Sequence, residues 1–190
     1  MLKAGANPIG RSSRGITPAE LACAHGKPKI VSFIVDAALK ASLPESEISA
    51  AMRCLMAAHL VEAILKNDHA AERQTLRKTR AAMTDEEFVF CVSSNITSVF
   101  FESVRYDMIE CVRLMLDGGA NIEEADGDCN TPLNMAARYS QLEVAELLIA
   151  RGANIEATTE RGYTPIQFAK TKEMYNLLRK KGAKDAPRVV

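Results

Sequence analysis

The chain has 190 residues, of which 47% are hydrophobic and 25% are charged. This composition excludes a wholly disordered protein, because such chains combine low hydrophobicity with high net charge. The 24 basic and 24 acidic residues cancel, so the overall charge does not require nucleic acid or an anionic membrane as a partner. The length suits one compact domain or one elongated array of small units.

The sequence also gives indications of the cellular location of the protein. No stretch approaches ~18 uncharged apolar residues, and the first residues do not open an apolar signal core. We therefore expect a soluble protein without a membrane partner. The five cysteines are scattered and contain no C-x-x-C pair, which argues against a disulfide framework and a zinc site. A cytoplasmic or otherwise intracellular location fits best, and secretion as an effector into a host cell stays open.

Two markers recur along the chain at an offset of 33 residues. The Gly-Ala-Asn-Ile-Glu segment at 119–123 returns at 152–156, and the Thr-Pro pair at 131–132 returns at 164–165. Near the N-terminus, Gly5 and Thr17 are separated by the same 12 residues as Gly119 and Thr131. The chain is therefore built from repeated units, and its first residues belong to the same kind of unit.

Each marker has a local structural meaning. A Thr before Pro can cap the N-terminus of a helix, and a Gly past the last turn can close one. Apolar triplets at i, i+3, i+4 predict a second helix in each unit; they are Ile30/Phe33/Ile34, Val61/Ile64/Leu65, Cys111/Leu114/Met115, Val144/Leu147/Leu148 and Met174/Leu177/Leu178. The expected helices are 18–25, 29–40, 46–57, 59–67, 70–82, 85–93, 98–105, 108–117, 132–139, 142–150, 165–171 and 173–180, and Thr84 to Glu87 forms a capping-box pattern.

These residues resemble the ankyrin-repeat family, whose period is about 33 and whose marker is T-P-L-H-x-A. Residues 131–137 read Thr-Pro-Leu-Asn-Met-Ala-Ala, and 164–169 and 17–22 are similar. The resemblance implies an all-α solenoid of helix-turn-helix units with hairpin-like turns and about six helix pairs. At the family's usual His, this sequence has Glu20, Asn134 and Gln167, which can still hydrogen-bond to a neighbouring turn.

The resemblance divides the expected single array, 1–190, into four parts. Residues 1–40 form a regular repeat with a truncated start, and 96–184 form regular repeats with a C-terminal cap. Residues 41–95 are divergent repeats or an inserted helical hairpin, and 185–190 are a tail. Met1 to Asn7 read as the end of a repeat whose helices are missing. Either the chain is a fragment of a longer array, or its first helix pair covers its own face.

No common catalytic, nucleotide-binding or metal-binding motif is present. We therefore expect no enzyme activity, no catalytic residues, no cofactor and no metal. His25, His59 and His69 have no carboxylate or Cys at ligand spacing, and Cys23, Cys54 and Cys111 lie among apolar residues as small hydrophobic side chains. Cys129 occupies the turn position of Gly15 and Gly162 and is expected to be exposed.

Charge and repeat position together predict the functional surface. Residues 101–160 hold twelve acidic and four basic residues, whereas 161–190 hold eight basic and two acidic; these are solvated faces or they steer a partner. The dipeptide Arg105-Tyr106 recurs as Arg138-Tyr139 at the 33-residue offset. Since Arg and Tyr dominate interface hot spots, the expected partner-binding residues are Arg105, Tyr106, Asp128, Asn130, Arg138, Tyr139, Arg161 and Tyr163. Alternatively, Tyr106 and Tyr139 pack together as a structural ladder.

We predict a protein-protein interaction module that binds its partner stoichiometrically through its concave face and turn tips, as a monomer. The acidic turns suit a partner protein with a basic patch. Alternatively, the chain is the ankyrin portion of a larger enzyme or microbial effector whose activity lies elsewhere. Nucleic-acid binding by the basic helix Arg73 to Arg80 is less favoured, because no aromatic residue is interleaved there to stack on a base.

Overall fold

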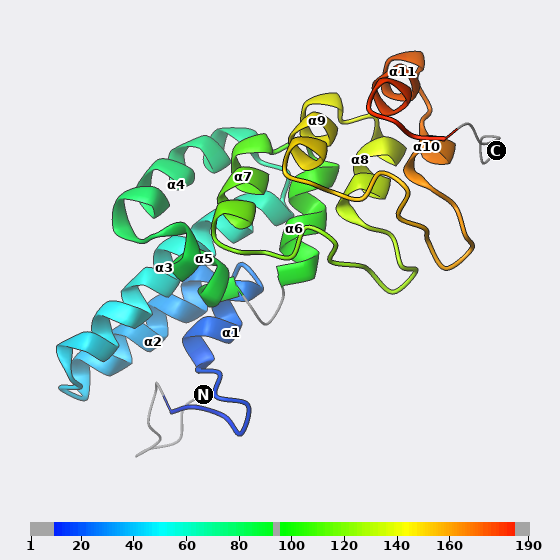
Figure 1. Ribbon diagram of the computed structural model, residues 1–190. Helices are drawn as coiled ribbons and strands as arrows, with labels where there is room; N and C mark the ends of the chain where they lie inside the picture. The colour runs from blue at the N-terminus through cyan, green and yellow to red at the C-terminus, as the bar shows by residue number, and fades with distance from the viewer. Residues whose placement is uncertain (1–9, 93–95, 185–190) are drawn as a thin grey trace. The chain divides into compact units, whose positions relative to one another are not determined.

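The computed structural model describes residues 10–92 and 96–184, and Figure 1 shows the arrangement of its helices. Within these ranges there are eleven helices and no strand, which confirms the all-α prediction. The chain divides into two compact units, one ending at Val99 and one beginning at Phe100, which are described separately. Met1 to Asn7, the tail 185–190 and the turn around Asn95 lie outside the described residues.

Unit 1 is organised around one long helix. Its helices are α1 (Pro18–Ala24), α2 (Pro28–Lys40), α3 (Glu45–Leu65), α4 (His69–Ala82) and α5 (Asp85–Val92). α3 packs against each of the other four, and it contributes buried residues along its whole second half, among them Ala57, Leu60, Val61 and Ile64. The core of unit 1 therefore lies along α3.

The sequence analysis expected two helices, 46–57 and 59–67, where α3 is continuous. That prediction was wrong because Ala57, Ala58 and His59 include no Gly or Pro, so nothing in the local sequence ends the helix. In the part of the chain that the structure describes, α3 is also the one helix that is long and apolar enough to cross a membrane by length and composition. Its packing against four helices in unit 1 accounts for that apolar composition.

The turn between α1 and α2 lies directly against the backbone of α3. Gly26 has a φ of +57°, and a Cβ built on it would come within 2.9 Å of the Cα and N atoms of Glu62. A side chain at this position is therefore excluded twice, by the left-handed backbone and by the contact. This close approach fixes the position of the α1–α2 pair against α3.

The outer face of α2 differs from its sequence prediction. Ile30 and Phe33, two members of the expected buried triplet, are 53% and 59% exposed, whereas Ile34 is buried. The buried stripe instead runs through Val31, Ile34 and Val35. The triplet correctly located a helix, but no described residue of unit 1 covers the face of α2 that carries Phe33. Leu21 on α1 is exposed as well.

Unit 2 consists of stacked helix pairs. Its elements are the end of α6 (Ile96–Arg105), α7 (Ile109–Asp117), α8 (Pro132–Tyr139), α9 (Leu142–Ala150), α10 (Pro165–Phe168) and α11 (Lys172–Lys180). α9 packs between α7 and α11, while α8 packs against α10 and α9, and the loops before α8 and α10 extend on the same side in Figure 1. α10 is shorter than the expected 165–171, because Ala169 is already extended.

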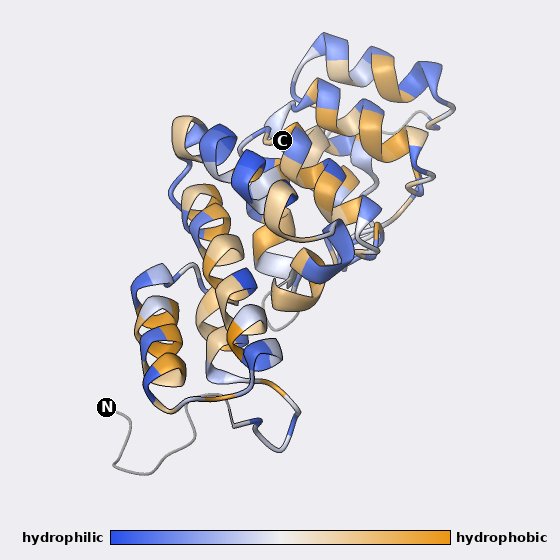
Figure 2. Cartoon of the chain, turned by 90° about the vertical axis from the view of Figure 1, so that its left-hand side faces the viewer, coloured by the Kyte–Doolittle hydropathy of each residue, from blue (hydrophilic) through white to orange (hydrophobic). Residues whose placement is uncertain are grey.

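The apolar triplets of unit 2 form its core. Leu114, Met115, Val144, Leu148, Met174 and Leu178 are all at most 1% exposed. Figure 2 shows the same arrangement by hydropathy, with hydrophobic and hydrophilic residues on different sides of the short helices. A helix with one apolar stripe buries it against its neighbours in the stack, so the triplets form the inter-repeat core of this unit, with Leu177 only half-buried.

The Thr-Pro markers begin helices as predicted. The backbone N–H of Thr17 donates to Glu20 Oε2 at 2.7 Å and that of Glu20 to Thr17 Oγ1 at 3.2 Å, which is a capping box. Thr131 with Asn134 and Thr164 with Gln167 repeat this arrangement, as does Thr84 with Glu87 before α5. Each cap satisfies N–H groups that the first turn of a helix leaves unpaired.

Candidate partner-binding surface

Three loops share one hydrogen-bonded turn. In residues 12–16, 126–130 and 159–163, the first N–H donates to the carbonyl of the fifth residue at 2.9, 3.1 and 3.0 Å. The fourth residue has positive φ in each, at Gly15, Cys129 and Gly162. The predicted equivalence of Cys129 with the two glycines is confirmed, and Cys129 is exposed. These turns form the tips of the hairpin-like loops that precede α1, α8 and α10.

In the middle turn, Asp126 is a structural residue. Its carboxylate accepts the backbone N–H groups of Asp128 and Asn130, each at 2.9 Å, and the side-chain amide of Asn130 at 2.9 and 3.0 Å. Asn130 is only 6% exposed. The amide of Asn130 therefore holds the turn together, while the side chain of Asp128 points to solvent from the same loop.

Neighbouring repeats are joined by the Glu of the Gly-Ala-Asn-Ile-Glu segments. Glu123 Oε1 accepts the backbone N–H of Asn154 at 2.7 Å, and Glu156 Oε1 accepts that of Lys184 at 2.8 Å. The same hydrogen bond from a backbone N–H to this Glu thus recurs in successive repeats. Asn134 adds a second link, because its Nδ2 donates to the carbonyls of Ala157 and Tyr163 in the next loop at 3.5 Å. The expectation that Asn134 bonds to a neighbouring turn is confirmed.

The recurring Arg-Tyr pairs meet through one guanidinium. The Cζ atom of Arg105 lies 5.4 Å from the ring centroid of Tyr106 and 5.3 Å from that of Tyr139 in the following repeat. Gln141 Nε2 donates to the carbonyl of Arg105 at 2.8 Å, which fixes the backbone beside it. Cation–π contacts of this kind hold aromatic rings in defined positions. Arg105 therefore links the two tyrosines across the repeat boundary.

Beside this cluster lies an open groove of about 280 Å³ between the second and third turn tips. Arg138 Cζ is 6.0 Å from the Phe168 ring centroid, and the rings of Tyr163 and Phe168 meet edge to face with centroids 6.1 Å apart. The backbone N–H of Glu160 donates to the Asp128 carbonyl at 3.0 Å and joins the two loops. The groove is lined by Asp128, Asn130, Arg138, Thr159, Glu160, Arg161, Tyr163 and Phe168.

The groove combines an aromatic floor with charges of both signs. Asp128, Glu160, Arg138 and Arg161 are exposed, and Tyr163 and Phe168 provide the aromatic surface. Such a mixture suits a peptide or loop that presents an apolar side chain flanked by charged ones.

The structure gathers five of the predicted residues, Asp128, Asn130, Arg138, Arg161 and Tyr163, around this groove. The other three, Arg105, Tyr106 and Tyr139, form the adjacent cation–π cluster. The predicted partner-binding set did not include Phe168, Thr159 and Glu160, although Glu160 is a turn-tip residue by the 33-residue offset. Phe168 could have been singled out from the sequence, because it is an aromatic residue at the position where the preceding repeat has Met135, 33 residues earlier.

Other residues considered in the sequence analysis belong neither to the groove lining nor to the cation–π cluster. His25, His59 and His69 are exposed, and His59 Nδ1 is 2.8 Å from the Leu55 carbonyl. The basic side chains on α4 are exposed too. Cys23, Cys54 and Cys111 are buried, which confirms their expected place in the core.

The fold and the linked turn tips define unit 2 as a stack of helix-turn-helix repeats. Residues 115–169 match the family model described as ankyrin repeats (many copies). No curated protein matches the chain. Residues 115–169 therefore consist of ankyrin repeats. Ankyrin repeats are generally protein-interaction modules and are typically not catalytic, so a protein partner is indicated.

Proposed function

We propose that this protein binds a partner protein stoichiometrically through the groove and the cation–π cluster of unit 2, without catalysis. The observation that carries the proposal is the juxtaposition of the two: the Arg105-centred tyrosine pair and the groove of about 280 Å³ lie at neighbouring first-helix ends and turn tips of the same repeats. In the ankyrin family these positions form the concave face and its rim.

The side chains of this surface are suited to binding before a partner arrives. Tyr139 is 39% exposed, and its contact with Arg105 restricts its ring. A restricted aromatic side chain loses little conformational entropy when a partner covers it. Tyr and Arg also combine a large contact area with a polar end, which explains their frequency at interface hot spots. The cluster is therefore the expected energetic centre of the interface.

The rim is expected to select the partner by charge. Asp128 and Glu160 are exposed at adjacent turn tips, within the segment 101–160 that carries an excess of eight acidic residues. Charges of this kind speed encounter with a partner of opposite sign. We propose a partner with a basic patch, bound by the monomeric chain in a reducing intracellular compartment, which the five free cysteines support.

The test compares affinity capture by the wild type and by a Tyr106→Ala/Tyr139→Ala variant, followed by calorimetry with the captured partner. Tyr139→Ala alone is expected to weaken binding by roughly 1–3 kcal/mol, the usual cost of removing an aromatic anchor. Leu142→Ala is the matched control, because Leu142 is also partly exposed but, on α9, neither lines the groove nor belongs to the cation–π cluster. Its affinity should equal that of the wild type.

Melting curves separate this role from a structural one. If Tyr139→Ala lowers the melting temperature and leaves the affinity unchanged, the Arg-Tyr cluster is a structural ladder and the proposed interface is wrong. Equal losses of affinity in Tyr139→Ala and Leu142→Ala would also contradict it, because they would show no preference for the groove side of the repeat.

A further inference from the structure

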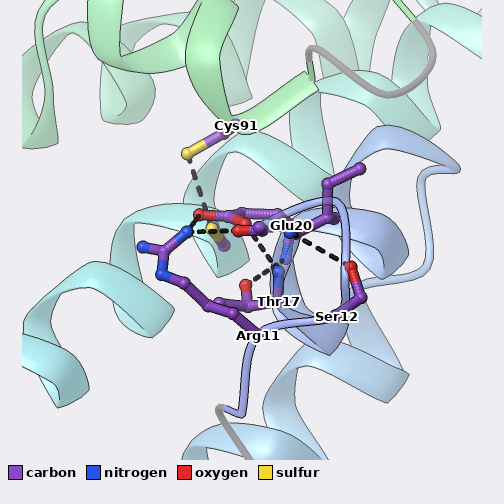
Figure 3. Close-up of polar contacts among 8 residues, drawn as sticks. Arg11, Ser12, Thr17, Glu20 and Cys91 are labelled. Atoms are coloured by element: carbon purple, nitrogen blue, oxygen red, sulfur yellow. Dashed lines mark hydrogen bonds and ion pairs between the residues drawn. The ribbon is translucent and has the colours of Figure 1, made fainter.

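Three cysteines from three helices of unit 1 meet in its interior. Cys23 on α1, Cys54 on α3 and Cys91 on α5 are all buried, and the Sγ atoms of Cys54 and Cys91 are 3.4 Å apart. Figure 3 shows Cys91 reaching from α5 toward this partner sulfur, beside Arg11 and Glu20. Two thiols in contact need only a small side-chain movement to reach bonding distance of about 2.0 Å.

A cavity leads from the surface to this pair. It holds about 350 Å³ and is lined by Cys54 and Cys91 together with charged side chains, Arg11, Glu20, Arg53, Glu86 and Glu87. Cys23 does not line it and is fully buried. A small polar solute can therefore approach Cys54 and Cys91, whereas Cys23 lies behind them.

The surroundings distinguish the two accessible thiols. Hydrogen bonds from Cys23 and then Cys54 lower the pKa of the Cys91 thiol, and the nearby Arg53 acts in the same direction. The hydrogen bond with Cys23 lowers the pKa of the Cys54 thiol. The hydrogen bond with Cys91 and the burial of Cys54 have a larger opposite effect, so its pKa is raised. The direction of these shifts favours a thiolate on Cys91 rather than on Cys54. Among the described residues no group of three ligands is arranged to hold a metal ion.

We propose that Cys54 and Cys91 are an oxidation site that forms a reversible disulfide with a peroxide as the two-electron oxidant. The Cys91 thiolate attacks one peroxide oxygen, the O–O bond breaks, and the leaving hydroxide takes a proton to become water. Cys54 then attacks the sulfur of the resulting sulfenic acid, its proton passes to the departing hydroxyl, and a second water leaves. Two thiols lose two electrons and one peroxide gains them.

The bond would fasten α5 to the central helix of unit 1. It would close a loop between positions 37 residues apart, with the whole of α4 inside it. Cross-linking such a loop restricts the unfolded chain and raises the melting temperature of the unit. For a unit of this size the expected rise is roughly 10–30 °C, and a thiol reductant should reverse it.

Peptide mapping tests the site directly. Trypsin places the five cysteines on five different peptides, 15–29, 54–66, 81–105, 106–113 and 114–138. The full chain carrying Cys129→Ser, which removes the exposed thiol, is treated with one equivalent of hydrogen peroxide, alkylated and digested without reduction. We expect peptides 54–66 and 81–105 to be linked, and the link to vanish after reduction.

The same oxidation in concentrated urea is the control for geometry. There the preference for the pair should disappear, because contact between the helices is lost. A dominant link to peptide 15–29 in the folded protein, the absence of any link, or an equal preference in urea would each overturn the proposal.

Substitution tests the order of the two steps. In Cys23→Ser/Cys54→Ser the sulfenic acid on Cys91 has no neighbouring thiol to resolve it, so it should accumulate and react with dimedone on peptide 81–105. In Cys91→Ser no label is expected on peptide 54–66, and Cys23→Ser should still form the link. Dimedone labelling of Cys54 instead of Cys91 would contradict the assigned roles, and the peptide map of the Cys129→Ser chain decides the pair even if one of these further variants fails to fold.

Discussion

Replacing Asp126 by Ala should destabilise unit 2, although Asp126 lies in a surface loop. The change removes the acceptor of two backbone N–H groups and of the Asn130 amide. Because Asn130 is 6% exposed, its amide would be left buried without this partner, which costs about 1–3 kcal/mol. Loss of the two backbone bonds adds to that, so we expect the free energy of unfolding to fall by about 2–4 kcal/mol.

Asp128→Ala is the matched control, two residues along the same turn. Its side chain is exposed, and removing it should change the unfolding free energy by less than about 0.5 kcal/mol. Denaturant unfolding followed by tyrosine fluorescence measures both variants, because all four tyrosines lie in unit 2 and the chain has no tryptophan. Equal stabilities of the two variants would refute the role assigned to Asp126.

Four further results are expected. Leu148→Ala should cost roughly 2–5 kcal/mol in the same assay, and a loss below about 1 kcal/mol would contradict its place in the inter-repeat core. Cys129→Gly should stabilise unit 2 by about 0.5–1 kcal/mol by relieving a φ of 58°, so a lower unfolding midpoint would argue against strain at this turn. Gly26→Ala should lower the free energy of unfolding of unit 1 by about 1–3 kcal/mol, as measured by the circular dichroism of its helices. If the variant melted at the same temperature as the wild type, the turn at Gly26 would be able to move away from α3 without cost. Amides in 69–92 should exchange faster than those in 142–150 in hydrogen-exchange mass spectrometry, and equal protection would show that α4 and α5 are as firmly packed as α9.

The acidic rim has its own test in binding kinetics. Charge reversal by Asp128→Lys should slow association with a basic partner and change its salt dependence, with little effect on dissociation. Asp126 is unsuitable for this purpose because its carboxylate holds the turn. An association rate that is unchanged at low salt would mean that the acidic turns do not steer the partner.

The sequence by itself determined the features that depend on neighbouring residues. Thr131 and Thr164 are the N-caps of α8 and α10, and Gly119 and Gly152 follow the ends of α7 and α9 with positive φ, because caps and left-handed turns are satisfied within a few residues. The 33-residue offset correctly equated Cys129 with Gly162, since the same turn must be built in each repeat. These local rules are strongest in unit 2, where the markers are complete.

The tertiary structure decided which surfaces are covered and which distant residues meet. The periodicity of α2 showed where its apolar residues lie, but Phe33 is exposed while Ile34 is buried, because burial depends on whether another helix covers that side. The contact of Cys54 with Cys91 depends on how α5 packs against α3, across 37 residues with no repeated marker between them. Phe168 reaches the groove for a similar reason, since Arg138 and Tyr163 are brought around it by the stacking of successive repeats. Such contacts depend on the packing of whole helices, which no short sequence pattern encodes.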